Sequence, residues 1–170
     1  VAMQSVALEN FTFQFGTGAF NTTGVRPSGS GSTIRVGNST TFVYGAYVKD
    51  CWFTETPSSG LFNYNGFSIV ENCTFELGKY GVYSENKSGN TVKIITCEIV
   101  GADTAVYLDS NINATITNCR FQQNGLNSSY GDIYALNCDR LSAIGNQSAA
   151  SQGAFVYSRS EEHTSELQSH

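Results

Sequence analysis

Short stretches of alternating apolar and polar residues recur along this chain, and each recurrence has the same internal spacing. Four copies contain a cysteine, and these cysteines follow one another every 22 to 24 residues: Cys51, Cys73, Cys97 and Cys119. Weaker copies without the cysteine begin at Val6 and Leu141. A fixed period of this length, built from strand-like units, is typical of a solenoid in which each repeat forms one turn.

Each copy consists of two apolar pairs on either side of a polar step. Ser68 and Val70 precede Asn72 in one copy, and Cys73 and Phe75 follow it. Because side chains alternate between the two faces of a strand, each half of the copy is predicted to be a strand with one buried face. The polar residue between the halves suits a tight bend whose side chain bonds to the backbone. The bend positions are Asn10, Asp50, Asn72, Thr96, Asn118 and Gly145.

A second motif, an apolar residue followed by tyrosine, lies between the cysteine copies and supplies one more strand per repeat. Its tyrosines are Tyr83, Tyr107, Tyr134 and Tyr157, with a degenerate member at Phe62 to Tyr64. Three short parallel strands per repeat predict an all-β fold, a right-handed parallel β-helix of about six coils. We expect residues 1–158 to form this single domain.

The repeats resemble those of the right-handed parallel β-helix, or pectate-lyase-like, superfamily. Asn72-Cys73-Thr74-Phe75 followed by Gly81-Val82-Tyr83 matches the Asn-Cys-x-Phe and Gly-Ile-Tyr steps typical of that superfamily, as does Asn118-Cys119-Arg120-Phe121. The resemblance covers roughly residues 5 to 158 and is specific for architecture. It does not choose an activity, because the fold hosts lyases, hydrolases, epimerases and phage tailspikes.

The cysteine column is expected to face the interior. Phe11 takes the same position in the first copy, which indicates a place for an apolar side chain. Neighbouring cysteines would lie within reach of one another, but their parallel Cβ directions disfavour a disulfide. No histidine or acidic residue shares the column, so we expect free buried thiols and no metal site. Cys138 lies outside this register, at the turn after Tyr134, and is a candidate for an exposed thiol.

Residues 159–170 resemble the translation of a sequencing-library adapter and are treated as a non-native tail. The two histidines of the chain, His163 and His170, both lie in this segment. Because residues 1–158 contain no histidine, Ser–His and Cys–His catalysis is excluded for them. The chain begins at Val1 without an initiator methionine and reaches Ser158 in mid-coil, so we expect a fragment of a longer protein, open at both ends.

Charge and hydropathy narrow the classes of partner. The net charge is −5, with no basic stripe, which argues against nucleic acid. No run of apolar residues is long enough to span a membrane. We therefore expect a polysaccharide partner that is neutral or cationic, no cofactor, and an extracellular, virion or cell-surface location. A homotrimer is a candidate assembly of the full-length protein.

Candidate site residues lie on the outward positions of the tyrosine motif. Tyr64, Tyr83, Tyr107 and Tyr134 would form an aromatic surface on which sugar rings stack. This hypothesis requires rings that are outward, coplanar and not covered by the insertion at residues 122–131. The alternative is that the tyrosines serve surface packing or a subunit interface. A longer insertion, residues 16–32, is either a second part of a binding rim or a tolerated loop.

Glu85 and Asp109 lie two residues beyond Tyr83 and Tyr107 and are expected to be neighbours on one face. A close pair of carboxylates suits glycoside hydrolysis, so these two are the candidate catalytic residues. The Asn-Thr-Asp, paired-Asp and calcium-binding signatures of enzymes in the superfamily are missing from the sequence. Glu98 and Arg120, on another outward column, are expected to form a surface ion pair.

The function favoured by the sequence is a polysaccharide-engaging β-helix segment of a phage tail spike, a tail fibre or a bacterial surface protein. One alternative is a polysaccharide lyase or glycoside hydrolase whose catalytic residues lie partly outside this chain. Another is a purely structural spacer.

Overall fold

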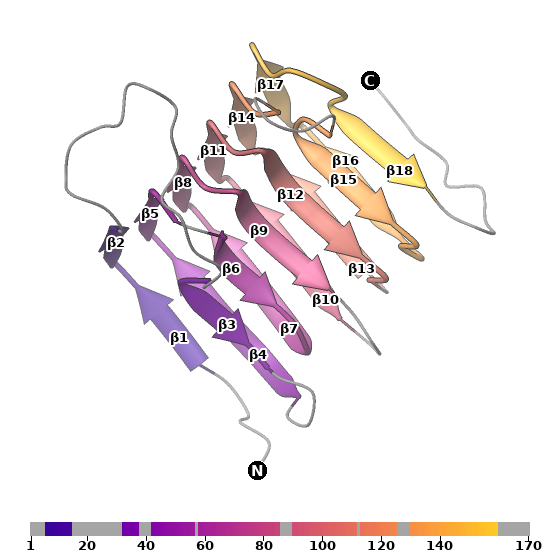
Figure 1. Ribbon diagram of the computed structural model, residues 1–170. Coiled ribbons are helices and arrows are strands. Elements are labelled where there is room, and N and C mark those ends of the chain that lie inside the picture. Colours follow the sequence, from indigo (N-terminus) through magenta and orange to yellow (C-terminus); the bar gives the residue numbers. More distant parts are fainter. Residues whose placement is uncertain are drawn as a thin grey trace.

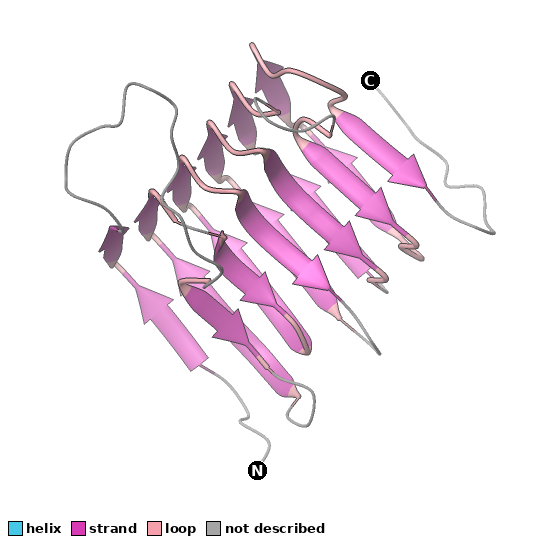
Figure 2. Ribbon diagram, viewed as in Figure 1, coloured by secondary structure: helices cyan, strands magenta, loops and turns pink. Residues whose placement is uncertain are grey.

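The computed structural model describes residues 6–14, 32–37, 42–56, 58–85, 90–111, 113–125 and 130–159. Every regular element among them is a β-strand, and the strands form three parallel sheets of six strands that stack as a solenoid (Figures 1 and 2). This part of the chain contains no helix of the length and apolar character needed to cross a membrane.

The three sheets each take one strand from every turn. Sheet A contains β1 (Val6–Glu9), β4 (Val43–Lys49), β7 (Gly66–Glu71), β10 (Thr91–Ile95), β13 (Asn113–Thr117) and β16 (Leu141–Ile144). Sheet B contains β2 (Thr12–Gln14), β5 (Trp52–Thr54), β8 (Thr74–Glu76), β11 (Glu98–Val100), β14 (Arg120–Gln122) and β17 (Gln147–Ala149). Sheet C contains β3 (Ile34–Val36), β6 (Ser59–Asn63), β9 (Tyr80–Glu85), β12 (Thr104–Asp109), β15 (Ile133–Leu136) and β18 (Val156–Arg159).

This arrangement confirms the parallel three-strand repeat. Each cysteine copy forms a strand of sheet A, a bend and a strand of sheet B, and each tyrosine motif forms a strand of sheet C (Figure 1). The sequence did not predict β3, whose Ile34 pairs with Leu61 of β6. β18 ends at Arg159, the first residue of the segment expected to be foreign, and residues 160–170 lie outside the described part of the chain.

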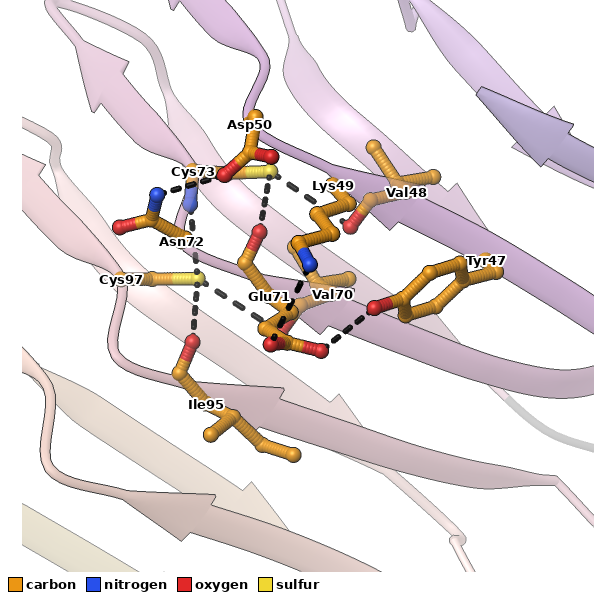
Figure 3. Close-up of polar contacts among 10 residues, drawn as sticks. All are labelled: Tyr47, Val48, Lys49, Asp50, Val70, Glu71, Asn72, Cys73, Ile95 and Cys97. Atoms are coloured by element: carbon orange, nitrogen blue, oxygen red, sulfur yellow. Dashed lines mark hydrogen bonds and ion pairs between the residues drawn. The ribbon is translucent and has the colours of Figure 1, made fainter. Parts of the chain in front are cut away.

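The bend between sheets A and B has the same backbone conformation in every turn. Its residues have positive φ, for example 51° at Asn72 and 54° at Asn118, a region that asparagine tolerates better than most residues. The expectation that the side chain bonds to the backbone is wrong for Asn72, whose Nδ2 donates to Asp50 Oδ1 of the preceding turn (Figure 3). The side chain points to solvent because the left-handed bend turns Cβ outward. The backbone N–H of Asn72 donates to the Ile95 carbonyl oxygen of the next turn.

The interior consists of columns of like residues. Phe13, Phe53 and Phe75 stack with ring centroids 5.0 and 4.7 Å apart and interplanar angles of 11° and 6°. Ile99 and Phe121 continue the column and are fully buried. Parallel in-register pairing places each aromatic ring over the next, so one turn shields the apolar surface of its neighbour.

The cysteine column lies beside the phenylalanine column. Cys51, Cys73, Cys97 and Cys119 are buried free thiols, which confirms the expected ladder. The Cys97 thiol contacts the carbonyl of Ile95 in its own turn at 3.3 Å and that of Val70 in the preceding turn at 3.6 Å (Figure 3). Hydrogen bonds with the neighbouring Cys119 and Cys73 thiols, together with burial, raise the pKa of Cys97 well above its ordinary value.

Two expectations are wrong, one about this column and one about Cys138. Phe11 does not fill the interior: it is 50% exposed and leans on Phe13, because β1 and β2 are edge strands and no described strand covers their outer side. Cys138 is not an exposed thiol. It is half-buried and packs against the core, where its thiol donates to the carbonyl of Leu136.

Replacement of one ladder thiol by a hydroxyl tests this packing. Cys97→Ser should lower the free energy of unfolding by about 1–3 kcal/mol, because it buries a more polar group in a site shaped for sulfur. Cys138→Ser is the matched control, and its loss should be smaller because the site is half-buried. Urea unfolding followed by circular dichroism measures both, and equal losses for the two variants would contradict the ladder's special burial.

Candidate functional site: the tyrosine face of sheet C

The outward face of sheet C carries a continuous column of aromatic side chains. Strand pairing places Tyr107 beside Tyr83 on one side and beside Tyr134 on the other. Phe62 precedes Tyr83 in the column, and Tyr157 follows Tyr134. The predicted alignment of these residues on successive turns is therefore confirmed, and we call them the tyrosine ladder.

The rings of the tyrosine ladder cover one another. The centroids of Tyr83 and Tyr107 are 5.1 Å apart with an interplanar angle of 45°, and those of Tyr107 and Tyr134 are 4.8 Å apart with an angle of 32°. The expectation of coplanar rings is wrong, because an aromatic ring is wider than the spacing between strands. Rings on adjacent strands overlap instead of lying side by side, tilted in these two pairs and nearly parallel (12°) between Tyr134 and Tyr157, so the ladder presents ring edges and hydroxyl groups to solvent.

Two further tyrosines, which the repeat pattern did not identify, pack on the ladder. Tyr80 stacks on Tyr83 at 5.0 Å and contacts Tyr107 at 5.3 Å. Tyr130, at the end of the insertion, lies 4.1 Å from Tyr134 and leaves it only 7% exposed. The expectation that Tyr134 is uncovered is therefore wrong. In the sequence, only spacing marks these two residues. Tyr80 lies three residues before the ladder residue Tyr83, and Tyr130 lies three residues before the start of β15, which carries Tyr134.

Stacking changes the acidity of the phenols. Burial, with the nearby Tyr134 phenol and Asp109 carboxylate, raises the pKa of Tyr107 from 10.0 to about 12. Burial and a hydrogen bond to Glu85 also raise the pKa of Tyr83. The Tyr83 and Tyr107 phenols are therefore neutral at physiological pH and present hydroxyl groups that can both donate and accept hydrogen bonds.

A row of polar side chains runs beside the ladder at the ends of the same strands. Glu85 and Asp109 are paired residues on β9 and β12, which confirms that they are neighbours on one face. Glu85 Oε2 accepts a hydrogen bond from the Tyr83 hydroxyl at 3.0 Å, and Asp109 Oδ1 accepts one from Ser110 Oγ at 2.8 Å. Leu136 occupies the equivalent position on β15.

An arginine closes the ladder at its N-terminal end. The Arg35 guanidinium lies 5.3 Å from the Phe62 ring centroid and 4.9 Å from that of Tyr64. Tyr64 also meets Phe62 edge to face, with centroids 5.6 Å apart. The structure therefore brings Tyr64 to the same face as Tyr83 and Tyr107, but with a cation rather than a carboxylate beside it.

The insertion that carries Tyr130 is anchored by a buried carboxylate. Asp132 is fully buried, and Asn124 Nδ2 donates to its Oδ1 at 2.9 Å from the other end of the insertion. Ser151 and Ser148 of the next turn also donate to Asp132. Residues 126–129, like residues 16–31 of the longer insertion at 16–32, lie outside the described part of the chain. The described ends show that the insertion is fixed to the solenoid at both sides.

The site is therefore a strip of phenol edges with two adjacent carboxylates along one side. Such a strip can exchange several hydrogen bonds with a polyhydroxylated ligand. No group of three or more potential metal ligands occurs within the described ranges. The Glu98–Arg120 ion pair is confirmed at 3.0 Å, but it lies on sheet B and is separate from the strip.

Comparisons with known proteins found no relative from which a function could be taken. No protein-family model, no curated protein and no solved structure matches the chain. The functional argument therefore rests on the chemistry of the sheet C face.

The raised phenol pKa values predict an alkaline stability loss. Below pH 10, Tyr107 is protonated in both folded and unfolded chains. Between pH 10 and about 12 the unfolded chain releases this proton while the folded chain retains it, so the free energy of unfolding falls with rising pH. Ultraviolet absorbance of phenolate, recorded during a pH titration of the folded protein, measures the raised pKa from which this loss of stability follows. Titration of all tyrosines together near pH 10 before unfolding would contradict it.

Removal of the Asp132 carboxylate should loosen the end of the insertion. Asp132→Ala removes the acceptor of one of the two Asn124 Nδ2 hydrogen bonds in a buried place, while the bond to Ile99 O remains, and this should cost roughly 1–3 kcal/mol of unfolding free energy. Ser148→Ala, which removes one donor at an exposed residue, should cost less. Thermal unfolding of both variants tests this order, and an Asp132→Ala protein as stable as the parent would rule out the anchoring role.

Proposed function

We propose that this chain is a polysaccharide-engaging segment of a phage tail spike, a tail fibre or a bacterial surface protein, and that the sheet C face is its binding surface. The observation that carries the proposal is the repetition of one polar pair on adjacent turns. Tyr83 with Glu85 on β9 is followed in register by Tyr107 with Asp109 on β12. Polysaccharides also repeat, so a surface that repeats its hydrogen-bonding groups suits a polymeric ligand.

The contact differs in kind from stacking on a flat aromatic surface. The faces of the ladder rings are occupied by neighbouring rings. Rings are more accessible at Tyr157, the last ladder residue (40% exposed), and at Tyr130, which packs on the ladder (37% exposed). Sugar hydroxyls would therefore meet phenol hydroxyls and carboxylates along the middle of the strip. Carboxylates make strong hydrogen bonds to hydroxyl donors because the acceptor is charged.

A structural spacer is the second candidate, and mutual ring stacking favours it. Stacked rings on a solenoid surface stabilise neighbouring turns whether or not a ligand binds. The catalytic hypothesis, a polysaccharide lyase or glycoside hydrolase that uses Glu85 and Asp109, also stays a proposal. It is supported by the adjacency of the two carboxylates and tested by the release of reducing ends or of unsaturated products from any glycan that binds.

A glycan array followed by affinity measurements on the parent protein and Tyr107→Phe tests the binding proposal. The substitution keeps the ring stack and removes one hydroxyl, which has no hydrogen-bond partner among the described residues. Affinity for the bound glycan should fall roughly threefold to tenfold with unchanged thermal stability, the value of one or two hydrogen bonds.

Tyr44→Phe is the matched control, because Tyr44 is 64% exposed on β4 of sheet A, away from the ladder. The affinity of the Tyr44→Phe protein for the glycan should equal that of the parent protein. Absence of binding to any glycan, or equal losses in both variants, would contradict the proposal and favour the spacer.

A further inference from the structure

We infer that the ligand is an extended, non-acidic polysaccharide chain that lies along the solenoid axis, with one sugar unit for each turn. This inference rests on the proposed function and names the class of glycan that the same surface accepts.

The first step is the match between two repeats. Strands of a sheet are about 4.8 Å apart, and the Tyr83 and Tyr107 ring centroids are 5.1 Å apart. One pyranose unit of an extended β-linked chain advances by a similar length. A chain parallel to the axis therefore places successive sugar units over the two adjacent turns that carry Tyr83 with Glu85 and Tyr107 with Asp109, whereas a coiled α-linked glucan does not keep this register.

The second step is charge. Glu85 and Asp109 lie next to each other in the middle of the strip, and neither forms an ion pair with another described residue. Of the described cations on this face, Arg35 and Lys79 contact aromatic rings, and Arg159 lies beside Leu136 where β18 pairs with β15. An acidic polymer would bring its carboxylates against Glu85 and Asp109 on these two adjacent turns. Hydroxyl or amino groups of a neutral or basic sugar would instead donate to them.

The third step is the length of the polar row. Strand pairing places Asp109 beside Glu85 and Leu136 beside Asp109, and the Leu136 side chain offers no hydrogen-bonding group. On that same turn Tyr134 is covered by Tyr130. Affinity should therefore rise with ligand length while additional units reach polar turns and level off when the chain passes Leu136.

Titration calorimetry with oligosaccharide series of increasing length tests all three steps. The probes are cello-oligosaccharides and chitosan oligomers, which are β-linked, malto-oligosaccharides, which are α-linked, and oligogalacturonate, which is acidic. We expect affinity for at least one β-linked series to rise with length and then level off, with malto-oligosaccharides and oligogalacturonate binding more weakly.

Two substitutions give readouts that a merely structural role would not produce. Asp109→Asn should weaken binding of the β-linked oligomers about tenfold, the value of a charge-assisted hydrogen bond, and strengthen binding of oligogalacturonate. Leu136→Glu should extend the polar row by one turn, so that affinity levels off one sugar unit later. Gln147→Glu adds the same charge to the exposed face of sheet B and should change neither property.

The outcomes separate this inference from the proposed function. Oligogalacturonate or malto-oligosaccharide binding as tight as that of the β-linked series overturns the inference, as does affinity that is independent of length or a Leu136→Glu protein with an unchanged length dependence. Binding to an array glycan without binding to any β-linked series also overturns it and leaves the proposed function standing. Absence of binding to every glycan overturns both.

Discussion

The fold depends on parallel strands that pair in register from one turn to the next. Each turn must return the chain to a position directly beside its previous passage, and this requires sharp bends between the sheets. Residues with positive φ provide them, as at Asp50 and Asn72 between sheets A and B and at Leu77 between sheets B and C. Once the bends are set, every residue lies beside its equivalent in the next turn, and side chains must be compatible with copies of themselves.

Inside the solenoid, this constraint favours side chains that stack or that bond to the backbone. Phenylalanine rings stack at 4.7–5.0 Å, and each ladder thiol reaches carbonyls in its own and the preceding turn. The last turn departs from the apolar pattern, because Asn146 replaces a cysteine and donates to Ile116 O. Ser148 likewise replaces a phenylalanine and bonds to the buried Asp132. Polar groups in this turn are satisfied by partners that the apolar turns do not have.

Outside the solenoid, the same register creates the candidate site and limits it. It aligns Tyr83 with Tyr107 and Glu85 with Asp109, which gives a surface that repeats at the spacing of the turns. It also holds the rings too close to lie flat, so that they shield one another and expose edges and hydroxyls. A ligand of this face is therefore recognised by repeated hydrogen bonds more than by broad aromatic stacking.

The sequence by itself determined the three-strand repeat, the buried cysteine column and the adjacency of Glu85 with Asp109, because period and alternation fix which residues share a column. Tertiary structure alone decided the tilt of the tyrosine rings, the covering of Tyr134 by Tyr130 and the exposure of Phe11. Ring tilt depends on side-chain rotation against neighbours, and covering depends on where an insertion ends. Exposure depends on whether another strand lies beside the residue. None of these is a property of the repeat, so the repeat could not predict them.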